Sequence, residues 1–352
     1  MPQDLPSQVR YKYSKSSAFY LGTKKSFFSD NDALLERAAR QSKLYASQPA
    51  RTHCKLCNSP LPPATDFTSH GVGYSFCADC SHLNGAFEDT KAFIEQLYVA
   101  DAGSEYSSNY IDKDFVRRTR DIYVPKIDFL LENLAPGEHR LLDVGCGSGY
   151  LVYAALLRDL PARGIDVGSL MVDFGNRQIS HFANAAPLTH VAEKAFYESI
   201  MTSEADIVAA IGVIEHLREP HEFFKAFANS GASYLYYSVP MFSFSVILEN
   251  IFTDIFPRQL SGGHTHLFTE ESLQRMNSLI GVRPVAEWRF GTDVTDLYRS
   301  VLTSLRKNRV SQQLIERLDK GLATSIDDIQ AVFDRSHFCS EIHCVAAKGV
   351  AA

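Results

Sequence analysis

The chain has 352 residues and a formal net charge of -6 at pH 7, with 45% hydrophobic and 22% charged residues. These values are ordinary for a globular protein, and they argue against a basic protein built to bind a polyanion. The most apolar stretch, residues 234–256, is interrupted by Pro240, Glu249 and Asp254, so we expect no membrane span. The chain start lacks the basic and then apolar pattern of a secretory signal, which favours a cytoplasmic protein.

Residues 1–50 are expected to form an arm followed by one helix. The segment up to about residue 30 shows no sustained periodicity. From Asp30 to Arg40, polar residues stand at the start and apolar residues recur every three or four positions, which predicts a capped helix.

Four cysteines in residues 51–86 predict a small zinc-binding module. They form two pairs with a two-residue gap, and 19 residues separate the pairs. This spacing is typical of a zinc site with four thiolate ligands, which is closed to substrate and therefore structural. Disulfides or a redox pair remain as alternatives. The predicted ligands are Cys54, Cys57, Cys77 and Cys80.

Residues 87–135 read as a helical connector. Helices are predicted near residues 90–98 and 112–134, on either side of the segment Glu105–Tyr110. The pair Pro136-Gly137 then breaks the pattern, and we place the start of the main domain, residues 136–352, at this break.

An apolar strand beginning at Leu141 runs directly into a glycine-rich turn. Glycine is required where the chain turns sharply or where a ligand approaches the backbone without meeting a Cβ atom. A dinucleotide fingerprint would have its third glycine one residue later, so the spacing favours a different nucleotide-like ligand. The candidate cofactor-binding residues here are Asp143, Gly145, Gly147 and Gly149.

Two further strands complete the predicted ligand edge. Arg163–Val167 contains Asp166, placed where an open α/β sheet presents a carboxylate to ribose hydroxyls. Ala205–Leu217 is apolar nearly throughout and reads as a buried parallel strand that ends in Glu215 and His216. Ligands bind at the carboxyl edge of such a sheet.

The remaining chain alternates strands and helices. Residues 233–240 predict a strand, 242–256 a largely apolar helix, and Thr269 the N-cap of a further helix. The capping box of that helix is expected to be incomplete, because Ser272 stands where an acid or amide would reach back. Later elements are expected at residues 283–290, 294–307, 326–333 and 341–347.

The glycine turn, Asp166 and the strand ending in Glu215-His216 together resemble the class I S-adenosylmethionine-dependent methyltransferases. The resemblance implies an α/β, Rossmann-like sheet of about seven strands with a small N-terminal zinc-binding module before it. It also implies that the glycine loop lies under the methionine and ribose part of S-adenosylmethionine, with Asp143 near the amino group. Asp166 would hold the ribose hydroxyls.

Methyl transfer to a hydroxyl or carbon acid requires a group that removes a proton. His216 is the best candidate base, because its ordinary pKa is near neutrality and it is expected at the cofactor edge. Glu215 could tune its charge from the neighbouring position. The alternative is that Glu215 and His216 position substrate or cofactor, since fold alone does not fix such a role.

The zinc module, the Glu105–Tyr110 segment and Glu215-His216 also resemble the sugar C-methyltransferases that act on nucleotide-linked sugars. This implies Tyr106 as a lid residue and His216 as the base, whereas a plain polar linker is the alternative for the tyrosine segment. We expect no further C-terminal α/β domain of the kind found in that family. The segments His264–His266 and Gly291–Asp296 resemble methyltransferases of surface-polysaccharide synthesis, so an O-methylated sugar competes as acceptor. His264 and His266 could also approach the acceptor.

The expected partner is therefore a small-molecule acceptor, a sugar or sugar nucleotide, and no nucleic acid. Three other functions remain open: methylation of another small molecule or of RNA, a non-catalytic zinc protein that binds S-adenosylmethionine, and a nicotinamide-dependent dehydrogenase. The cysteine region holds few basic residues, which argues against RNA.

Overall fold

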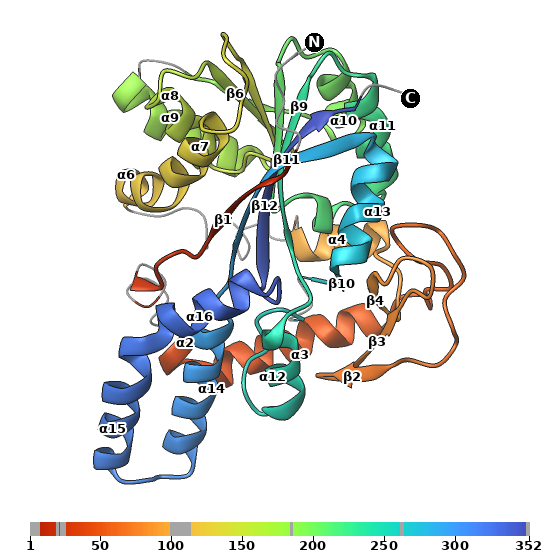
Figure 1. Cartoon of the computed structure of the whole chain (residues 1–352). Helices are drawn as coiled ribbons and strands as arrows, with labels where there is room; N and C mark the ends of the chain where they lie inside the picture. The colour runs from red at the N-terminus through yellow and green to blue at the C-terminus, as the bar shows by residue number, and fades with distance from the viewer. Residues whose placement is uncertain are drawn as a thin grey trace.

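The computed structural model describes residues 8–18, 21, 26–98, 114–183, 186–260 and 264–349. An eight-stranded sheet with helices on both faces forms one part of the molecule (Figure 1). A four-stranded sheet and further helices lie beyond the carboxyl end of strand β9, where the Phe268 amide donates to the Pro240 carbonyl.

The large sheet has the strand order β1-β11-β12-β9-β8-β5-β6-β7. The five strands from β9 to β7 are parallel, and β12 runs antiparallel to both its neighbours. The chain order reverses beside β5, and ligands bind at the carboxyl ends of strands at such a switch point. The bounds are β1 Arg10–Tyr13, β5 Leu141–Val144, β6 Ala162–Asp166, β7 Leu188–His190, β8 Ile207–Ile211, β9 Tyr234–Pro240, β11 Val282–Phe290 and β12 Glu341–Lys348.

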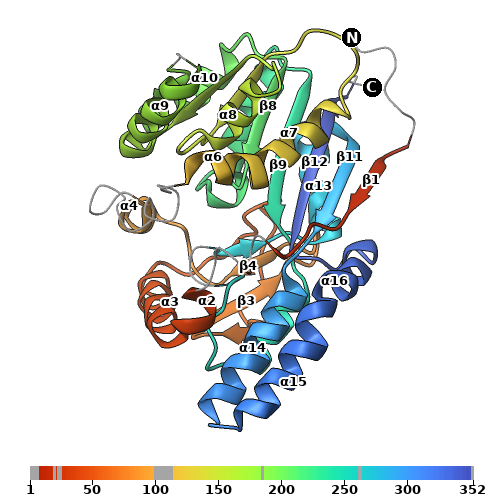
Figure 2. The same ribbon diagram turned by 90° about the vertical axis from the view of Figure 1, so that its left-hand side faces the viewer.

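Helices cover both faces of this sheet because its central strands are apolar on both sides (Figure 2). In β9, Tyr236 packs against Phe129 of α7 on one face, whereas Tyr237 packs with the core of α11 and α13 on the other. One layer comprises α6 Phe115–Arg118, the π-helical turn η2 Thr119–Tyr123, α7 Val124–Leu131, α8 Tyr150–Leu156 and α9 Ser169–Ala183. The other comprises α10 Glu193–Met201, α11 Pro220–Asn229 and α13 Glu270–Ile280.

The small sheet joins the cysteine-rich segment to a strand from the second half of the chain. Its order is β10-β4-β3-β2, and β10 pairs with β4 in antiparallel register, His266 opposite Asn84. Residue 268 then bridges to Met241 at the end of β9. The strand bounds are β2 Phe67–Ser69, β3 Val72–Phe76, β4 Leu83–Gly85 and β10 His266–Leu267.

The remaining helices lie around this smaller sheet and below the large one (Figure 1). α14, α15 and α16 share an apolar cluster that includes Val294, Tyr298, Leu302 and Ile315. These helices are α2 Ser26–Ser29, α3 Asn31–Ala46, α4 Lys91–Tyr98, α12 Phe244–Ile251, α14 Asp293–Lys307, α15 Gln312–Leu322, the short η4 Ala323–Ser325 and α16 Ile326–Arg335. Within the described ranges, no helix has the length and hydropathy needed to cross a membrane.

The α/β, Rossmann-like sheet expected from the sequence is confirmed, and β1 adds an eighth strand to it. The sequence analysis missed β1, which pairs with β11 in parallel within a segment that carries no periodic pattern. It also missed α15, whereas the helix predicted from Asp30 is confirmed as α3, although the Asp30 side chain caps no backbone group.

Two local predictions were wrong. The strand predicted over Ala205–Leu217 ends at Ile211, because Gly212 adopts a positive φ of 67° and turns the chain. The capping box of α13 is complete, since the Ser272 hydroxyl accepts from the Thr269 amide at 2.8 Å and Thr269 Oγ1 accepts from the Ser272 amide at 3.2 Å. A serine hydroxyl is thus long enough to serve where an acid or amide was expected.

Candidate active site

The glycine turn lies between the end of β5 and the start of α8, and all three of its glycines have positive φ. A Cβ atom on Gly145 would lie 2.7 Å from Val213, and one on Gly149 would lie 2.6 Å from Leu188. A Cβ atom on Gly147 would meet only Met171 Sδ, at 3.8 Å. Gly145 and Gly149 therefore serve close packing, whereas a side chain at Gly147 would have room.

Asp166, at the end of β6, holds this turn in place. Its Oδ2 accepts from the Gly147 amide at 2.8 Å and its Oδ1 accepts from the Gly168 amide at 2.7 Å. Each carboxylate oxygen has a second lone pair, which suits the ribose hydroxyls assigned to it by resemblance. The structure thus shows a role that the sequence did not indicate, which is to fix the backbone at Gly147.

Asp143 is buried in β5, with 4% of its surface exposed. Burial and the nearby Asp166 carboxylate hold its pKa well above the usual range, and Lys126 of α7 opposes this shift. A buried carboxyl of this kind favours a cationic partner, such as the amino group of a bound amino acid. Asp143 and Asp166 therefore lie near one another at the carboxyl ends of β5 and β6.

Glu215 and His216 form a short 3-10 turn, Ile214–His216, directly after β8. Val213, which starts this turn, is the residue that contacts Gly145, so the glycine turn and the Glu215–His216 turn touch. Glu215 is buried, and burial raises its pKa to about 8. His216 Nε2 lies 3.9 Å from Glu215 Oε1 and its side chain is 22% exposed.

His264 faces the same turn from the segment before β10. The rings of His216 and His264 lie 5.5 Å apart between centroids. His264 Nδ1 lies 2.9 Å from the Gln259 carbonyl, and burial lowers the pKa of His264 to about 4. The neutral ring therefore donates from Nδ1 and keeps a lone pair on Nε2.

His266 has a different role from its neighbour in sequence. Its Nε2 donates to the Glu215 carbonyl at 2.9 Å, and its Nδ1 lies 2.8 Å from Nε2 of His82. Both rings are buried, and burial lowers the pKa of His82 to about 3 and that of His266 well below its usual value. His266 thus supports the Glu215–His216 turn, and both of its ring nitrogens have partners within the protein.

A second polar group lies at the start of β12. His343 Nε2 contacts Glu341 Oε1 at 2.8 Å, its Nδ1 contacts the Tyr236 hydroxyl at 3.1 Å, and Lys126 Nζ lies 4.0 Å from Glu341. Glu341 influences the pKa of both Glu215 and His264, so it belongs to the same edge of the sheet. Polar residues two apart in an otherwise apolar strand are the sequence signal that could have identified Glu341 and His343.

The four predicted cysteine ligands converge. Their sulfur atoms lie within 4.8 Å of one another, with 3.7 Å between Cys54 and Cys80 and 3.5 Å between Cys57 and Cys77. Sulfurs 2.3 Å from a tetrahedral zinc ion are about 3.8 Å apart, so the four thiols fit zinc. Asn84 Nδ2 donates to the Cys54 sulfur at 3.6 Å, as a supporting group around a metal does.

The two cysteine pairs have the same backbone conformation. The Cys54 amide donates to the Ser59 carbonyl, and the Cys77 amide donates to the His82 carbonyl. The residue after each second cysteine has a positive φ, 62° at Asn58 and 57° at Ser81. This repeated turn points both thiols of each pair to one side.

Tyr106 and the Glu105–Tyr110 segment lie outside the described residues. The part of the connector that is described, from residue 114, contains a π-helical turn whose Tyr123 ring stacks on Tyr150, with 5.2 Å between centroids. Tyr150 follows Gly149, so this turn packs against the start of α8. No sequence signal indicated a π-helical turn at this place.

Residues 115–287 match a family model described as a methyltransferase domain. A search of curated proteins found no match. Among solved structures, the magnesium protoporphyrin IX methyltransferase of Synechocystis is 13% identical, with a TM-score of 0.46 over 74% of this chain and 100% of that one. An S-adenosylmethionine-dependent methyltransferase of Archaeoglobus fulgidus is 17% identical, with a TM-score of 0.42 over 67% and 100%. The cyclopropane synthase of Mycobacterium tuberculosis is 17% identical, with a TM-score of 0.42 over 65% and 85%.

The family model spans the strands that carry the glycine turn, Asp166 and the Glu215–His216 turn. The sheet of the protein is the α/β, Rossmann-like sheet of such enzymes. Residues 115–287 thus match the family of methyltransferase domains.

Proposed function

We propose that the protein transfers the methyl group of S-adenosylmethionine to a hydroxyl or carbon of a small acceptor, a sugar or a nucleotide-linked sugar. The observation that carries this proposal is the contact between the glycine turn at Gly145 and the Glu215–His216 turn at Val213. Gly147, Asp143 and Asp166 would hold the cofactor, which supplies an electrophilic methyl group when bound. The acceptor would then lie on the side of Glu215 and His216.

The side chains on that side favour a polar acceptor. His216, His264, Glu341 and Lys126 offer donors and acceptors around this edge of the sheet, and each can bind a hydroxyl group. A sugar presents several hydroxyls that can form hydrogen bonds with such a surface, whereas an apolar acceptor presents none. The resemblance to sugar methyltransferases is a second support.

Two roles are open to His216 under this proposal. It takes the proton that the acceptor loses, or it positions the acceptor without proton transfer. Glu215 supports either role from the buried side of the turn, and Tyr106 is proposed as a lid residue on the resemblance of its segment alone. The zinc ion is proposed to be structural, because four thiolates fill a tetrahedral site.

None of the seven cysteines is paired in a disulfide, which fits a reducing compartment, and we include a cytoplasmic location in the proposal. Calorimetric titration with S-adenosylmethionine, S-adenosylhomocysteine and a nicotinamide dinucleotide tests the function directly. Binding of the first two and not of the third supports it, after which a panel of nucleotide sugars tests the acceptor. A folded, zinc-loaded protein that binds neither S-adenosylmethionine nor S-adenosylhomocysteine would contradict the proposal.

A further inference from the structure

Glu215, His216 and His264 form a second group of side chains with metal-ligand chemistry, separate from the cysteines. One ligand atom from each lies within 4.8 Å of the others. Glu215 and His216 come from the turn after β8, and His264 comes from the segment before β10. Two loops that are distant in sequence thus bring a carboxylate and two imidazoles together.

The Glu215 carboxylate is incompletely satisfied where it lies. Its residue is 5% exposed, and Oε2 is buried without a hydrogen-bond partner. Buried polar atoms of folded proteins nearly always have a partner, because an unpaired one costs free energy. His216 Nε2 is 3.9 Å from the other carboxylate oxygen, Oε1, which is beyond hydrogen-bond length. A cation between these side chains would satisfy the carboxylate.

His264 is held with one nitrogen available to a ligand. Its Nδ1 donates to the Gln259 carbonyl at 2.9 Å, which fixes the ring and leaves the lone pair on Nε2. This is how histidine ligands of metals are oriented in proteins. The ring therefore needs no tautomer change to bind a cation.

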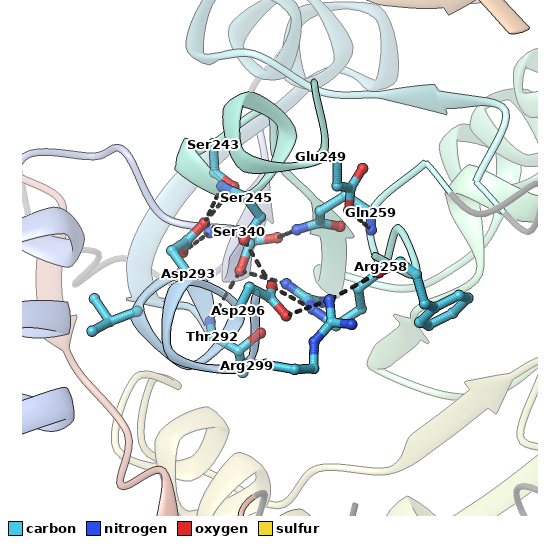
Figure 3. A network of polar contacts seen from close by, with 12 residues as sticks. Ser243, Ser245, Glu249, Arg258, Gln259, Thr292, Asp293, Asp296, Arg299 and Ser340 are labelled. Atoms are coloured by element: carbon cyan, nitrogen blue, oxygen red, sulfur yellow. Dashed lines mark hydrogen bonds and ion pairs between the residues drawn. The ribbon is translucent and has the colours of Figure 1, made fainter. Parts of the chain in front are cut away.

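The loop that carries the Gln259 carbonyl is itself fixed by a buried polar network (Figure 3). Glu249 of α12 accepts from the Gln259 amide at 2.5 Å and from the Leu260 amide at 3.1 Å. Arg258 Nε donates to Asp296 of α14 at 2.8 Å. Preorganised supporting groups of this kind are typical of sites whose geometry must be kept.

We propose that Glu215, His216 and His264 bind a divalent cation of the zinc or cobalt type. Two histidines and one glutamate are a ligand set of catalytic zinc sites, which keep a fourth position for water or substrate. The cysteine site has four protein ligands and is closed, so the two sites differ in kind. Glu215 forms the buried side of the site, and His216, whose side chain is 22% exposed, forms its open side.

This inference rests on the proposed methyl transfer and selects a hydroxyl acceptor. A hydroxyl bound to the open position becomes more acidic, and its proton leaves to solvent water. The resulting oxygen attacks the methyl carbon, the new O–C bond forms, and the S–C bond breaks with its electron pair left on sulfur. The sulfonium charge and the alkoxide charge cancel in this step, so no other co-reactant is required.

Cobalt titration of the zinc-loaded protein tests the site. Because zinc already occupies the cysteine site, added Co²⁺ should bind with one equivalent per chain and give visible absorption without a thiolate charge-transfer band. His264→Gln and Glu215→Gln should each weaken this binding by at least about tenfold, because removal of a ligand costs more than loss of a supporting group. His181→Gln, on the exposed end of α9, is the matched control and should bind cobalt as the wild type does.

The outcomes separate this inference from the proposed function. Cobalt that binds only with a thiolate band, or equally well to His264→Gln, overturns the second site. Zinc content and affinity for S-adenosylhomocysteine show whether each variant is folded. If the protein binds S-adenosylhomocysteine but not cobalt, the cation site is overturned and the proposed function stands. If it binds cobalt but not S-adenosylhomocysteine, the cation site stands and the proposed function is overturned.

Discussion

His266 donates a hydrogen bond to the backbone carbonyl of Glu215 at 2.9 Å, across 51 positions of sequence. A carbonyl only accepts, so the proton is on Nε2 of His266, and its Nδ1 must accept from Nε2 of His82. His82 Nδ1 in turn lies 3.3 Å from the Ser272 hydroxyl. Since His82 follows the second cysteine pair by two residues, one chain of hydrogen bonds joins the cysteine site to the Glu215–His216 turn.

Replacement of His266 by phenylalanine is expected to lower both stability and turnover. The change leaves the Glu215 carbonyl and the His82 Nε2 proton without partners, each at a cost of about 1–3 kcal/mol of unfolding free energy. Urea unfolding measures the loss of stability, and the turnover number measures the effect of a less well-held Glu215–His216 turn on catalysis. His181→Phe, at an exposed position, is the control and should change the unfolding free energy by less than about 0.5 kcal/mol. Unchanged stability and turnover would show that the hydrogen bond does not support the turn.

His216→Ala is expected to reduce turnover by about 10²- to 10⁴-fold, because the proposed function gives His216 the role of removing the proton of the acceptor or of positioning the acceptor. Its side chain is 22% exposed and does not belong to the glycine turn, so affinity for S-adenosylhomocysteine should stay the same. Steady-state kinetics with the true acceptor and calorimetry measure the two quantities. His181→Ala is the matched control. An unaltered rate in His216→Ala would remove His216 from the reaction.

Asp166→Ala is expected to weaken cofactor binding by about 10- to 100-fold, which corresponds to loss of one or more hydrogen bonds to a charged group. The Gly147 amide loses its acceptor at 2.8 Å, and the ribose hydroxyls lose theirs. Calorimetry with S-adenosylhomocysteine measures the change. Asp173→Ala, an exposed position on α9, should bind as the wild type does. If the affinity of Asp166→Ala equals that of the control, Asp166 does not contact the ribose.

The sequence predicted those parts of the site that depend on local backbone. Asp143 and the glycines predicted a strand followed by left-handed turns, and Cys54 and Cys57 predicted a tight metal-binding turn. Few residue types tolerate either geometry. The apolar run at Ile207–Ile211 likewise predicted a buried parallel strand. Such features are set within about ten residues of chain.

The contacts that join distant segments could not be predicted in this way. Neither His82 nor His266 has a neighbour in sequence that indicates the other, and their pairing follows from the alignment of β10 with β4. Lys126 lies in an apolar helix and meets Glu341 only after the chain has folded. The strand β8 was predicted too long because a glycine in an apolar run is compatible with strand and turn alike. In the structure Gly212 adopts the left-handed conformation, and the strand ends before it.

Cys77→Ser is expected to lower zinc content and to reduce thermal stability and turnover together. The variant removes one of four ligands from the site. His82, which follows the altered cysteine pair, forms a hydrogen bond with His266, and His266 in turn donates to the Glu215 carbonyl. Metal analysis, thermal unfolding and kinetics measure the three effects. Cys339→Ser, at a buried cysteine outside the cluster, should keep its zinc. Full zinc content in Cys77→Ser would argue against a four-thiolate site.

His343 is buried between strands of the large sheet and influences how stability depends on pH. Burial lowers its pKa to about 4, Lys126 and Lys15 add to this shift, and Glu341 opposes it. The Tyr236 hydroxyl contacts its Nδ1 at 3.1 Å. The ring is therefore neutral in the folded protein at neutral pH, whereas it gains a proton in the unfolded chain below a pKa of about 6.5.

Because the folded protein binds the proton less readily than the unfolded chain, the free energy of unfolding should fall as pH decreases from about 6.5 to about 4. At about 1.4 kcal/mol per pH unit, His343 contributes a loss of about 3 kcal/mol over this window. Urea unfolding at a series of pH values should therefore show a shallower decline for His343→Gln than for the wild type. His181→Gln, which changes an exposed ring, should keep the wild-type profile. Parallel profiles for the wild type and His343→Gln would mean that another group accounts for the decline.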